Sequence, residues 1–390
     1  MLRLRISLLL PFVFLAVLCA PSSQAQAQLG KIVSIPAGSD EDHQLKAINE
    51  TTDSAQKLTL LTAFAQTHPD GDMAIIADEQ MVGYYLGLKQ YDKAIEYGEK
   101  LFTLDPDSYS NAVNMVRAAN EKSDMDRLYN YGEKAVGIVQ RYKAAGPPEG
   151  MAADAWELQR NRKLDGIKED QEYIEASLIS AAYQQKDPTK KAEYLQRFAK
   201  IFPDSPNAEH AMGMSAFAYQ AAQSRTKMLQ AANATLDKYP NNIGMLLLLS
   251  DDYAEKGEQL DKAEAYAKKA ASLCETAKKP EGLADADWQN QITLQKGLAL
   301  STLGQIDIAK KDNLAATKNL SAASPLLKSN ATVYARNQYR LGFAYLNLKK
   351  LPEAKQALTE AASVDSPYKG PAQDKLKAMA TAKPSAKKGA

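Results

Sequence analysis

The sequence predicts an all-α protein, built as a right-handed superhelical solenoid of about eight antiparallel helix pairs with a C-terminal capping helix. Apolar residues recur three and four positions apart from Asp40 onward, and no alternating β-branched runs interrupt them. Pro and Gly fall between segments of about 12 to 18 residues, a length that suits paired antiparallel helices. Short motifs also recur at fixed spacings, which is typical of repeat architectures.

A four-residue motif gives the shorter period. Tyr97-Gly98-Glu99-Lys100 recurs 34 residues later as Tyr131-Gly132-Glu133-Lys134. Several segments also carry two alanines seven residues apart on the expected second helix of a pair. Because seven residues make about two helical turns, both alanines of a pair share one face, where a neighbouring helix can approach closely. These pairs are Ala192 and Ala199, Ala263 and Ala270, Ala309 and Ala316, and Ala354 and Ala361.

The most complete copy lies near the C-terminus, where Leu341-Gly342 and Tyr345 precede Ala354 and Ala361. This order resembles the tetratricopeptide repeat, a helix-turn-helix of about 34 residues with Leu-Gly, Tyr, Ala, Ala and Pro at set positions. The resemblance covers most of the chain after its first residues. The packing positions that it implies are Tyr85, Ala94, Ala135, Tyr183, Ala192, Ala199, Ala263, Ala270, Gly297, Ala309, Ala316, Gly342, Tyr345, Ala354 and Ala361.

A longer period relates two blocks of the chain. Phe64-Ala65 matches Phe198-Ala199 at a spacing of 134, and Trp156 matches Trp288 at a spacing of 132. We infer a tandem duplication of about four repeats. The expected organisation is a flexible lead-in at 28–38, a first repeat block at 39–186, a second block at 187–320, a final repeat with its capping helix at 321–380, and a disordered Lys-rich tail at 381–390.

Breaks at Pro and Gly set the expected bounds of the pairs. The eight pairs are Asp40–Pro69, Met73–Pro106, Tyr109–Ala144, Ala152–Pro203, Asn207–Pro240, Asn242–Ala277, Ala284–Leu320 and Ala331–Val364. The fourth is too long for one repeat, so its first helix is expected to extend over Trp156–Gln171. Pro371–Ala380 is expected to cap the last pair, since the end of a solenoid must cover its open apolar face.

The first residues predict a separate targeting segment at 1–27. Arg3 and Arg5 precede an apolar run from Ile6 to Ala20, and small residues lead to Ala27. That order is typical of a secretory signal cleaved after Ala27, which leaves no transmembrane helix. The expected location is the periplasm or outer envelope of a Gram-negative bacterium. Two alternatives stay open: an uncleaved membrane anchor, although the run is shorter than the ~20 residues that span a bilayer, and a lipoprotein acylated on Cys19.

Composition excludes several classes of function. The 390 residues include 48 basic and 47 acidic ones, whereas binding nucleic acid requires a clustered basic surplus. Two Cys cannot build a disulfide scaffold, and Cys274 is expected to be a buried small residue. His43, His68 and His210 lack partners at metal-ligand spacing. No catalytic motif stands out, so we predict no enzyme activity, no metal and no cofactor.

In this architecture, binding would use the concave groove lined by the first helices of the pairs. The expected contacts in the groove are Val113, Arg117, Asn120, Leu294, Leu298, Arg336, Tyr339, Arg340, Phe343 and Asn347. Arg336 and Arg340 are four residues apart, so they form either a patch for a carboxylate or ion pairs with acids on other helices.

Repeat proteins of this family that hold chaperone C-termini use Lys, Asn and Arg at set positions of their first three first-helices. The corresponding positions here are Glu79, Gly83, Asn114, Ile174 and Leu178, of which only Asn114 agrees. The resemblance therefore does not extend to that activity.

The sequence thus predicts a non-enzymatic, exported scaffold that binds a protein or peptide in its concave groove, within an envelope complex. The alternative is a receptor for a glycan or small molecule, or a cryptic hydrolase, that uses the loops at Trp156 and Trp288. Self-association into a homo-oligomer also stays open.

Overall fold

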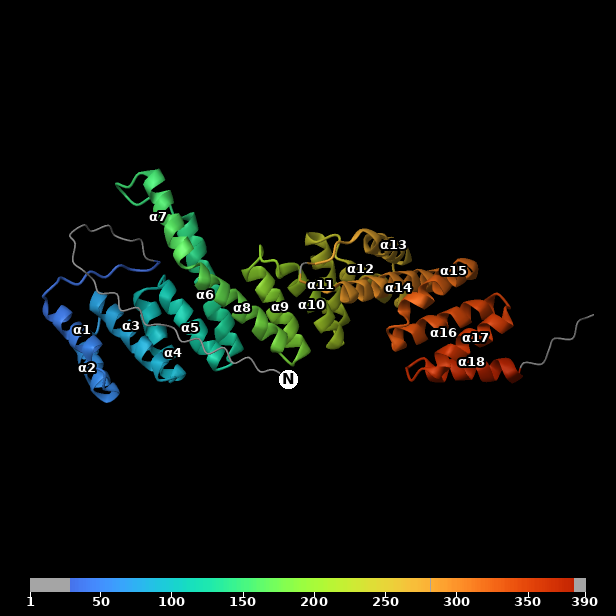
Figure 1. The fold of residues 1–390 in the computed structure, drawn as a ribbon, viewed down its shortest axis with the longest axis horizontal. Helices are drawn as coiled ribbons and strands as arrows, with labels where there is room; N and C mark the ends of the chain where they lie inside the picture. Colours follow the sequence, from blue (N-terminus) through green and yellow to red (C-terminus); the bar gives the residue numbers. More distant parts are fainter. Residues whose placement is uncertain (1–28, 281, 382–390) are drawn as a thin grey trace, which may run out of the picture. The chain divides into compact units, whose positions relative to one another are not determined.

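A computed structural model describes residues 29–280 and 282–381, and within this part of the chain every regular element is a helix. Figure 1 shows these helices following one another as neighbouring pairs. The packing forms two compact units, the first ending at Ile174 and the second beginning at Glu175. The predicted signal at 1–27, Cys19 and most of the predicted Lys-rich tail lie outside the described residues.

The first unit contains three helix pairs and the start of a fourth. Its helices are α1 (Asp40–Glu50), α2 (Ser54–Thr67), α3 (Gly71–Gly87), α4 (Tyr91–Leu104), α5 (Tyr109–Glu121), α6 (Met125–Ala144), α7 (Ala153–Gly166) and the beginning of α8 (Lys168–Gln184). The core of α1–α4 is built from apolar side chains that include Leu61, Phe64 and Met81, each 1% exposed or less.

The second unit continues the same pattern. After the end of α8 come α9 (Pro188–Ile201), α10 (Ala208–Ala221), α11 (Arg225–Lys238), α12 (Ile243–Lys256), α13 (Leu260–Thr276), α14 (Asp285–Ala309), α15 (Asn313–Ala323), the 3-10 helix η1 (Ser324–Leu327), α16 (Ala331–Asn347), α17 (Leu351–Ser363) and α18 (Lys369–Thr381). The predicted all-α architecture of adjacent helix pairs is confirmed. Helix α18 packs on α17 around the buried Ala372.

The turn within a pair has the same conformation in several repeats. Lys89, Ser123, Lys311 and Lys349 each have φ between 55° and 64°, in the left-handed region. The residue after each donates its N–H to a carbonyl five positions back, as Gln90 does to Tyr85 (2.8 Å). This bond satisfies a carbonyl that the end of a helix leaves open, and it fixes the direction in which the second helix starts.

Small residues set the distance between helices. A Cβ added to Gly342 of α16 would lie 2.6 Å from Cγ of Leu358 on α17. Similar close contacts would occur between Gly98 and Met115, and between Gly304 and Leu320. At these positions the two helices approach each other more closely than a side chain would allow.

In the seventh helix pair, α14 and α15, one residue does not lie on the helix predicted for it from the sequence. Ala309 was expected on the second helix, but it is the last residue of α14 and is exposed. Helix α14 has 25 residues, so the turn comes later than the 34-residue pattern places it. The small face of α15 is formed instead by Ala316 and Ala323, both 0% exposed.

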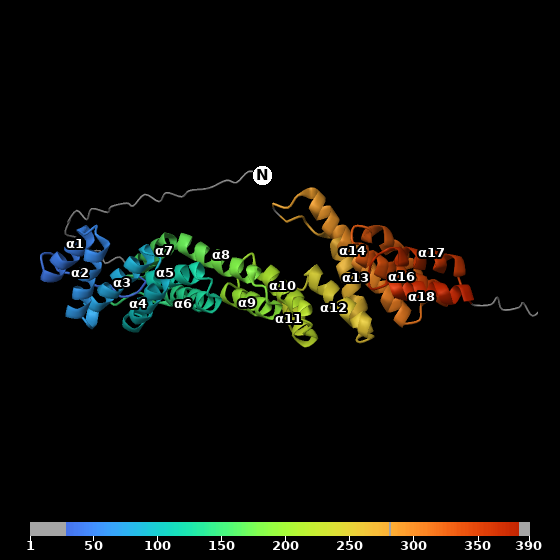
Figure 2. The ribbon, with the colours of Figure 1, turned by 90° about the horizontal axis from the view of Figure 1, so that it is seen from below.

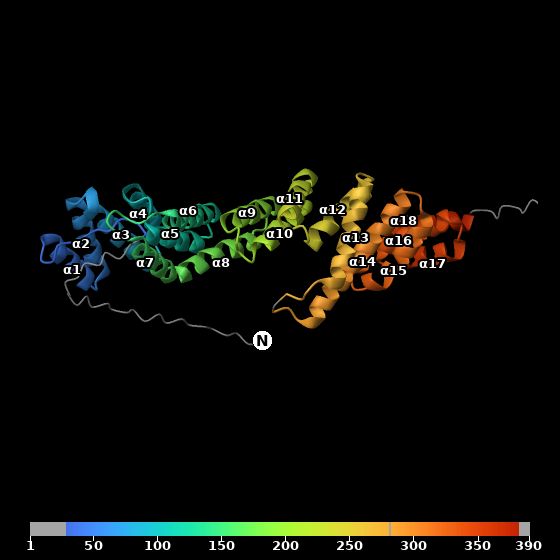
Figure 3. The ribbon, with the colours of Figure 1, turned by 90° about the horizontal axis from the view of Figure 1, so that it is seen from above.

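The fourth helix pair does not begin with the single extended helix that was expected over Trp156–Gln171. The chain leaves the helical conformation at Ile167 (φ −108°, ψ 7°), so α7 and α8 are separate helices. Figure 1 shows α7 projecting from the first unit alongside the end of α6. In the second unit the matching segment is the continuous helix α14, whose first turns extend beyond the packed pairs in Figures 2 and 3.

The segment before α1, expected to be a flexible lead-in, packs against the first unit. The carbonyl of Leu29 accepts a hydrogen bond from the N–H of Tyr109 (3.2 Å), and the N–H of Lys31 donates to Oδ2 of Asp105 (2.7 Å). Leu29 is 8% exposed, and Ile35 packs on the core of α1–α4. The expectation was wrong because long-range backbone hydrogen bonds leave no periodic signal in a short segment. Gln28 lies outside the described residues.

Replacing Gly342 by Ala is expected to destabilise the second unit. The new Cβ would overlap Leu358, and such overpacking costs more than the ~1 kcal/mol that Ala gains over Gly inside a helix, leaving a net loss of about 1–2 kcal/mol. Urea unfolding followed by circular dichroism measures this loss. The matched control is Gly213→Ala in α10, where the nearest atom is 3.7 Å away and stability should be unchanged or higher.

Replacing Asp105 by Ala is expected to release residues 29–36 from the first unit. The carboxylate accepts from the N–H groups of Lys31 and Asp107, and losing such charge-assisted bonds costs about 1.5–3 kcal/mol. Trypsin cleavage after Lys31 should therefore become about tenfold faster or more. Asp124→Ala, which removes the N-cap of α6, is the control, and an equal acceleration in that variant would contradict the assignment.

Candidate functional site

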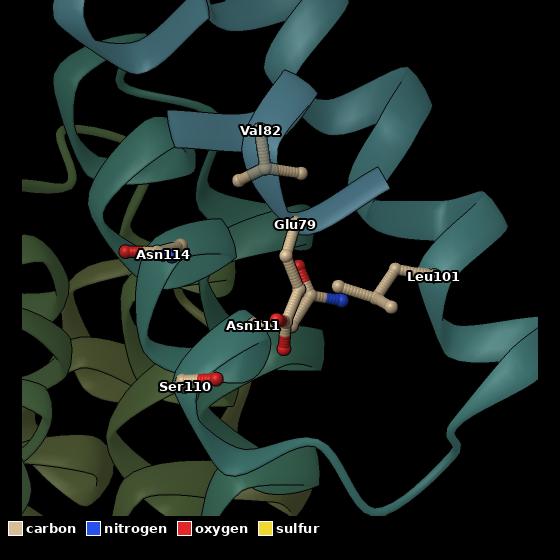
Figure 4. Close-up of a pocket in the computed structure, with 6 residues that line it drawn as sticks. All are labelled: Glu79, Val82, Leu101, Ser110, Asn111 and Asn114. Carbon is tan, nitrogen blue, oxygen red and sulfur yellow. The ribbon is translucent and has the colours of Figure 1, made fainter. Parts of the chain in front are cut away.

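The first unit contains a pocket of about 220 Å³ between the first helices of two successive pairs, α3 and α5, with α4 beside them. Figure 4 shows the side chains that line it, which are Glu79 and Val82 from α3, Leu101 from α4, and Ser110, Asn111 and Asn114 from α5. Two apolar side chains thus share the pocket with four polar ones.

Asn111 is the most constrained of these side chains. It is 1% exposed, and its Nδ2 donates to the carbonyl of Gly98 at 2.8 Å. That bond identifies which end of the amide is the nitrogen. The other end, Oδ1, is buried and has no hydrogen-bond partner. A buried acceptor without a partner is rare in folded proteins, because its desolvation costs about 1–3 kcal/mol.

Glu79 brings a negative charge to the pocket. Much of the residue remains accessible, yet its carboxyl group is in a partly desolvated position near Asp105. Desolvation, together with repulsion from Asp105, raises the pKa of Glu79. Both influences act against the charged form, so a nearby positive charge would stabilise it.

The three residues of α5 that were predicted for the groove have different surroundings. Val113 is only 2% exposed and belongs to the core, which corrects its assignment. The Nη2 atom of Arg117 contacts Oδ1 of Asp170 at 2.8 Å, and its guanidinium lies 5.6 Å from the ring centre of Tyr173. Asn120 donates to the hydroxyl of Tyr173 at 3.5 Å. These side chains join α5 to the start of α8.

In the second unit, Arg336 and Arg340 of α16 bind acids on α12. Nη1 of Arg336 lies 2.7 Å from Oδ2 of Asp251 and 3.1 Å from Oε1 of Glu255. Nη2 of Arg340 lies 3.3 Å from the same Glu255 oxygen. Thr302 of α14 adds a hydrogen bond to Asp251 at 3.2 Å. The two arginines therefore form ion pairs with helix acids, and they are not an open patch for a carboxylate.

Arg340 depends strongly on these acids. It is 6% exposed, and burial together with repulsion from Arg336 lowers its pKa, although a guanidinium stays charged at neutral pH. A charge so far removed from water requires partners of opposite sign. Asp251 and Glu255 of α12 supply these partners.

The remaining positions predicted for the groove on α16 are also occupied by the protein itself. The ring of Tyr339 lies 5.8 Å from that of Tyr368, and Nζ of Lys375 on α18 lies 4.8 Å from the ring centre of Phe343. Asn347 donates to Oδ1 of Asn313 at 2.9 Å. Helix α18 and the segment before it therefore cover this part of α16.

Leu294 and Leu298 of α14 are half-buried. Leu298 packs against the core that α10–α14 share, so it contributes to packing.

The predicted packing positions are mostly inaccessible. Tyr183 and Tyr345 are half-buried, and Ala309 is exposed as described above. The others are all buried, namely Tyr85, Ala94, Ala135, Ala192, Ala199, Ala263, Ala270, Gly297, Ala316, Gly342, Ala354 and Ala361. In the positions compared with chaperone-binding repeats, Ile174 and Leu178 are 1% and 0% exposed and so contact no ligand.

The two tryptophans have different surroundings. Trp156 is 6% exposed, and its Nε1 donates to the carbonyl of Ala145 at 3.1 Å, while its ring packs edge-on against Tyr142. That contact fastens α7 to the end of α6, and it leaves no free face for a ligand. Trp288 is half-buried near the start of α14.

Features that would indicate catalysis or metal binding are weak. Among the described residues, no group of three His, Cys, Asp or Glu side chains is arranged to hold a metal ion. His68 packs on Phe64, and His210 packs on Tyr183. Burial raises the pKa of the Cys274 thiol, which disfavours the thiolate that a nucleophile requires. Across 29–280 and 282–381, no helix combines the length and the apolar character needed to cross a bilayer.

Of the residues that line the pocket, the comparison with chaperone-binding repeats had included Glu79 and Asn114, whereas sequence reasoning missed Val82, Leu101, Ser110 and Asn111. One signal was present. Asn111 lies four residues before Met115, on the stripe of α5 that is otherwise apolar. A polar residue on such a stripe points to a buried hydrogen bond or a site.

Comparison with known proteins supports the repeat architecture. The model of the tetratricopeptide repeat family matches residues 83–108 and 335–368. These segments cover the end of α3 with α4, and most of α16 with α17. No curated protein sequence matches the chain.

The solved structures that match this chain are distant from it. The TPR domain of P58(IPK) is 14% identical, with 88% of this chain and 100% of that chain covered and a TM-score of 0.29. Yeast Tom70 is 12% identical, with 87% and 94% covered and a TM-score of 0.30. BtubC from P. vanneervenii is 12% identical, with 81% and 94% covered and a TM-score of 0.24. No functional conclusion follows from these likenesses.

Replacing Asp251 by Asn is expected to destabilise the second unit by about 2–3 kcal/mol. The substitution leaves Arg340 short of negative charge, and the loss stays below the ~3–5 kcal/mol of a fully buried pair because Asp251 is 28% exposed. Urea unfolding, with hydrogen exchange at α16, measures the effect. Glu193→Gln is the control, since its pair with Lys227 is half-exposed and should change stability by less than ~1 kcal/mol.

Proposed function

We propose that this chain, a tetratricopeptide-repeat protein, is a non-enzymatic scaffold that binds another protein through the groove between α3 and α5. The observation that carries the proposal is the pocket in that groove, which is lined in part by Asn111, a residue whose buried Oδ1 has no hydrogen-bond partner. Stacked helix pairs offer such grooves to extended peptides or partner helices.

The location of this groove differs from the one expected from the sequence. The predicted contacts on α16 are engaged with α12, with Asn313 of α15, or with α18 and the segment before it, whereas Ser110 and Glu79 are exposed residues of the pocket. The first unit is therefore the better candidate for binding a partner. We further propose that the protein acts after export, within an envelope complex, on the basis of the residue order at 1–27.

An extended polypeptide already lies beside this groove. Residues 29–31 bind Asp105 and the N–H of Tyr109, and Tyr109 directly precedes Ser110 of the pocket. The groups at the turn before α5 thus already bind one extended segment of this chain, and by analogy we favour a peptide segment of the partner over a small molecule for the adjoining pocket.

Photocrosslinking in the native host tests this function. A photoreactive amino acid at Ser110 should give a discrete adduct with one partner, because this exposed residue lines the pocket. The same amino acid at Glu96, which is exposed on α4, is the matched control and should give no such adduct. Equal adducts from both positions, or none from Ser110, would contradict the proposal.

A further inference from the structure

The geometry points to a specific ligand group for the pocket between α3 and α5. We propose that it binds the side-chain ammonium of a lysine on the partner polypeptide. This inference rests on the proposed function, because the lysine would belong to the protein held in the groove. Its basis is the set of oxygen atoms that Glu79, Ser110 and Asn111 bring to one small pocket.

The size of the pocket suits one side chain. Its volume is about 220 Å³, below the ~300–1,000 Å³ that is typical of pockets for drug-sized ligands. Val82 and Leu101 form its apolar lining, against which the methylene groups of a lysine can pack while the charged end reaches the polar residues. A whole cofactor or sugar would not be enclosed here.

The polarity of the pocket favours a donor over an acceptor. The carbonyl of Gly98 holds Nδ2 of Asn111, so Oδ1 is the amide atom that is left without a partner. Glu79 supplies a carboxylate and Ser110 a hydroxyl oxygen. An ammonium group has three donors and no acceptor, which matches three oxygens. A carboxylate ligand would be repelled by Glu79, and arginine would need a wider, planar arrangement of acceptors for its fork.

The electrostatics of Glu79 agree with a cationic ligand. Desolvation and the nearby charge of Asp105 both raise the pKa of Glu79. Both therefore disfavour the negatively charged form of its carboxylate. An ammonium in the pocket would offset both effects. The unpartnered oxygen of Asn111 would gain a charge-assisted hydrogen bond at the same time.

Binding of small probes tests the proposal directly. The isotopically labelled full chain is titrated with N-acetyl-lysine amide, and the side-chain amide signals of Asn111 and Asn114 are followed by NMR. The lysine probe should shift the Asn111 signal in a saturable manner. N-acetyl-norleucine amide, which has a similar stem and no charge, should not. An equal response to norleucine, a stronger response to N-acetyl-arginine amide, or no response to lysine would overturn the proposal.

Variants of the pocket residues test whether the carboxylate of Glu79 binds the ammonium group of the lysine probe. Glu79→Gln should weaken binding of the lysine probe at least tenfold, which corresponds to the loss of about 1.4 kcal/mol. Glu121→Gln is the matched control, because Glu121 is an exposed carboxylate on α5 outside the pocket, and its affinity should be unchanged. Ser110→Ala, at an exposed position with little risk to folding, should weaken binding several-fold. Unchanged affinity in Glu79→Gln would overturn the assignment.

The proposed function and the lysine pocket fail in different ways. If Ser110 still crosslinks to its partner with unchanged yield in Glu79→Gln, the groove binds a protein but lysine recognition is wrong. If the lysine probe binds as expected and no adduct forms in the host, the pocket chemistry holds while the scaffold function is contradicted.

Discussion

The rest of the structure depends on close contact between helices at residues that have little or no side chain. Gly98, Gly304 and Gly342 each face a large side chain of the neighbouring helix at a distance that a Cβ would not allow. Packing energy falls steeply with separation, so these contacts determine how deeply neighbouring helices interlock. They also determine the grooves, because the pocket beside α5 exists where the carbonyl of Gly98 is near enough to hold Asn111.

Local rules made much of the fold predictable. Helix ends follow residues that act over short distances, such as Asp124, whose side chain caps α6, and the left-handed residues in the turns. Two errors in the helix boundaries have one physical origin. The break at Ile167 and the late turn after Ala309 occur where a first helix differs in length from the common repeat, and helix length there depends on packing with neighbours instead of on a local signal.

The candidate site was less predictable, since it depends on contacts between residues far apart in sequence. Arg336 and Asp251 are separated by 85 positions, and a register taken from the repeat pattern shows which face of α16 carries the arginine but not what that face meets. The pocket combines residues of three helices. The sequence shows that Asn111 is a polar residue on an apolar stripe. Only the structure shows that its Nδ2 bonds to the carbonyl of Gly98 while its Oδ1 has no partner.

Charged side chains on the first helices of the pairs have different surroundings in the two units. In the second unit, Asp251 and Glu255 are four residues apart on α12, as are Arg336 and Arg340 on α16, so each helix presents two charges on one face and the opposite signs meet. In the first unit, Glu79 of α3 faces the amide and hydroxyl groups of α5, and burial and Asp105 both act against its charge. Internal pairing thus closes one surface, while the charge at Glu79 remains available to a ligand from outside the chain.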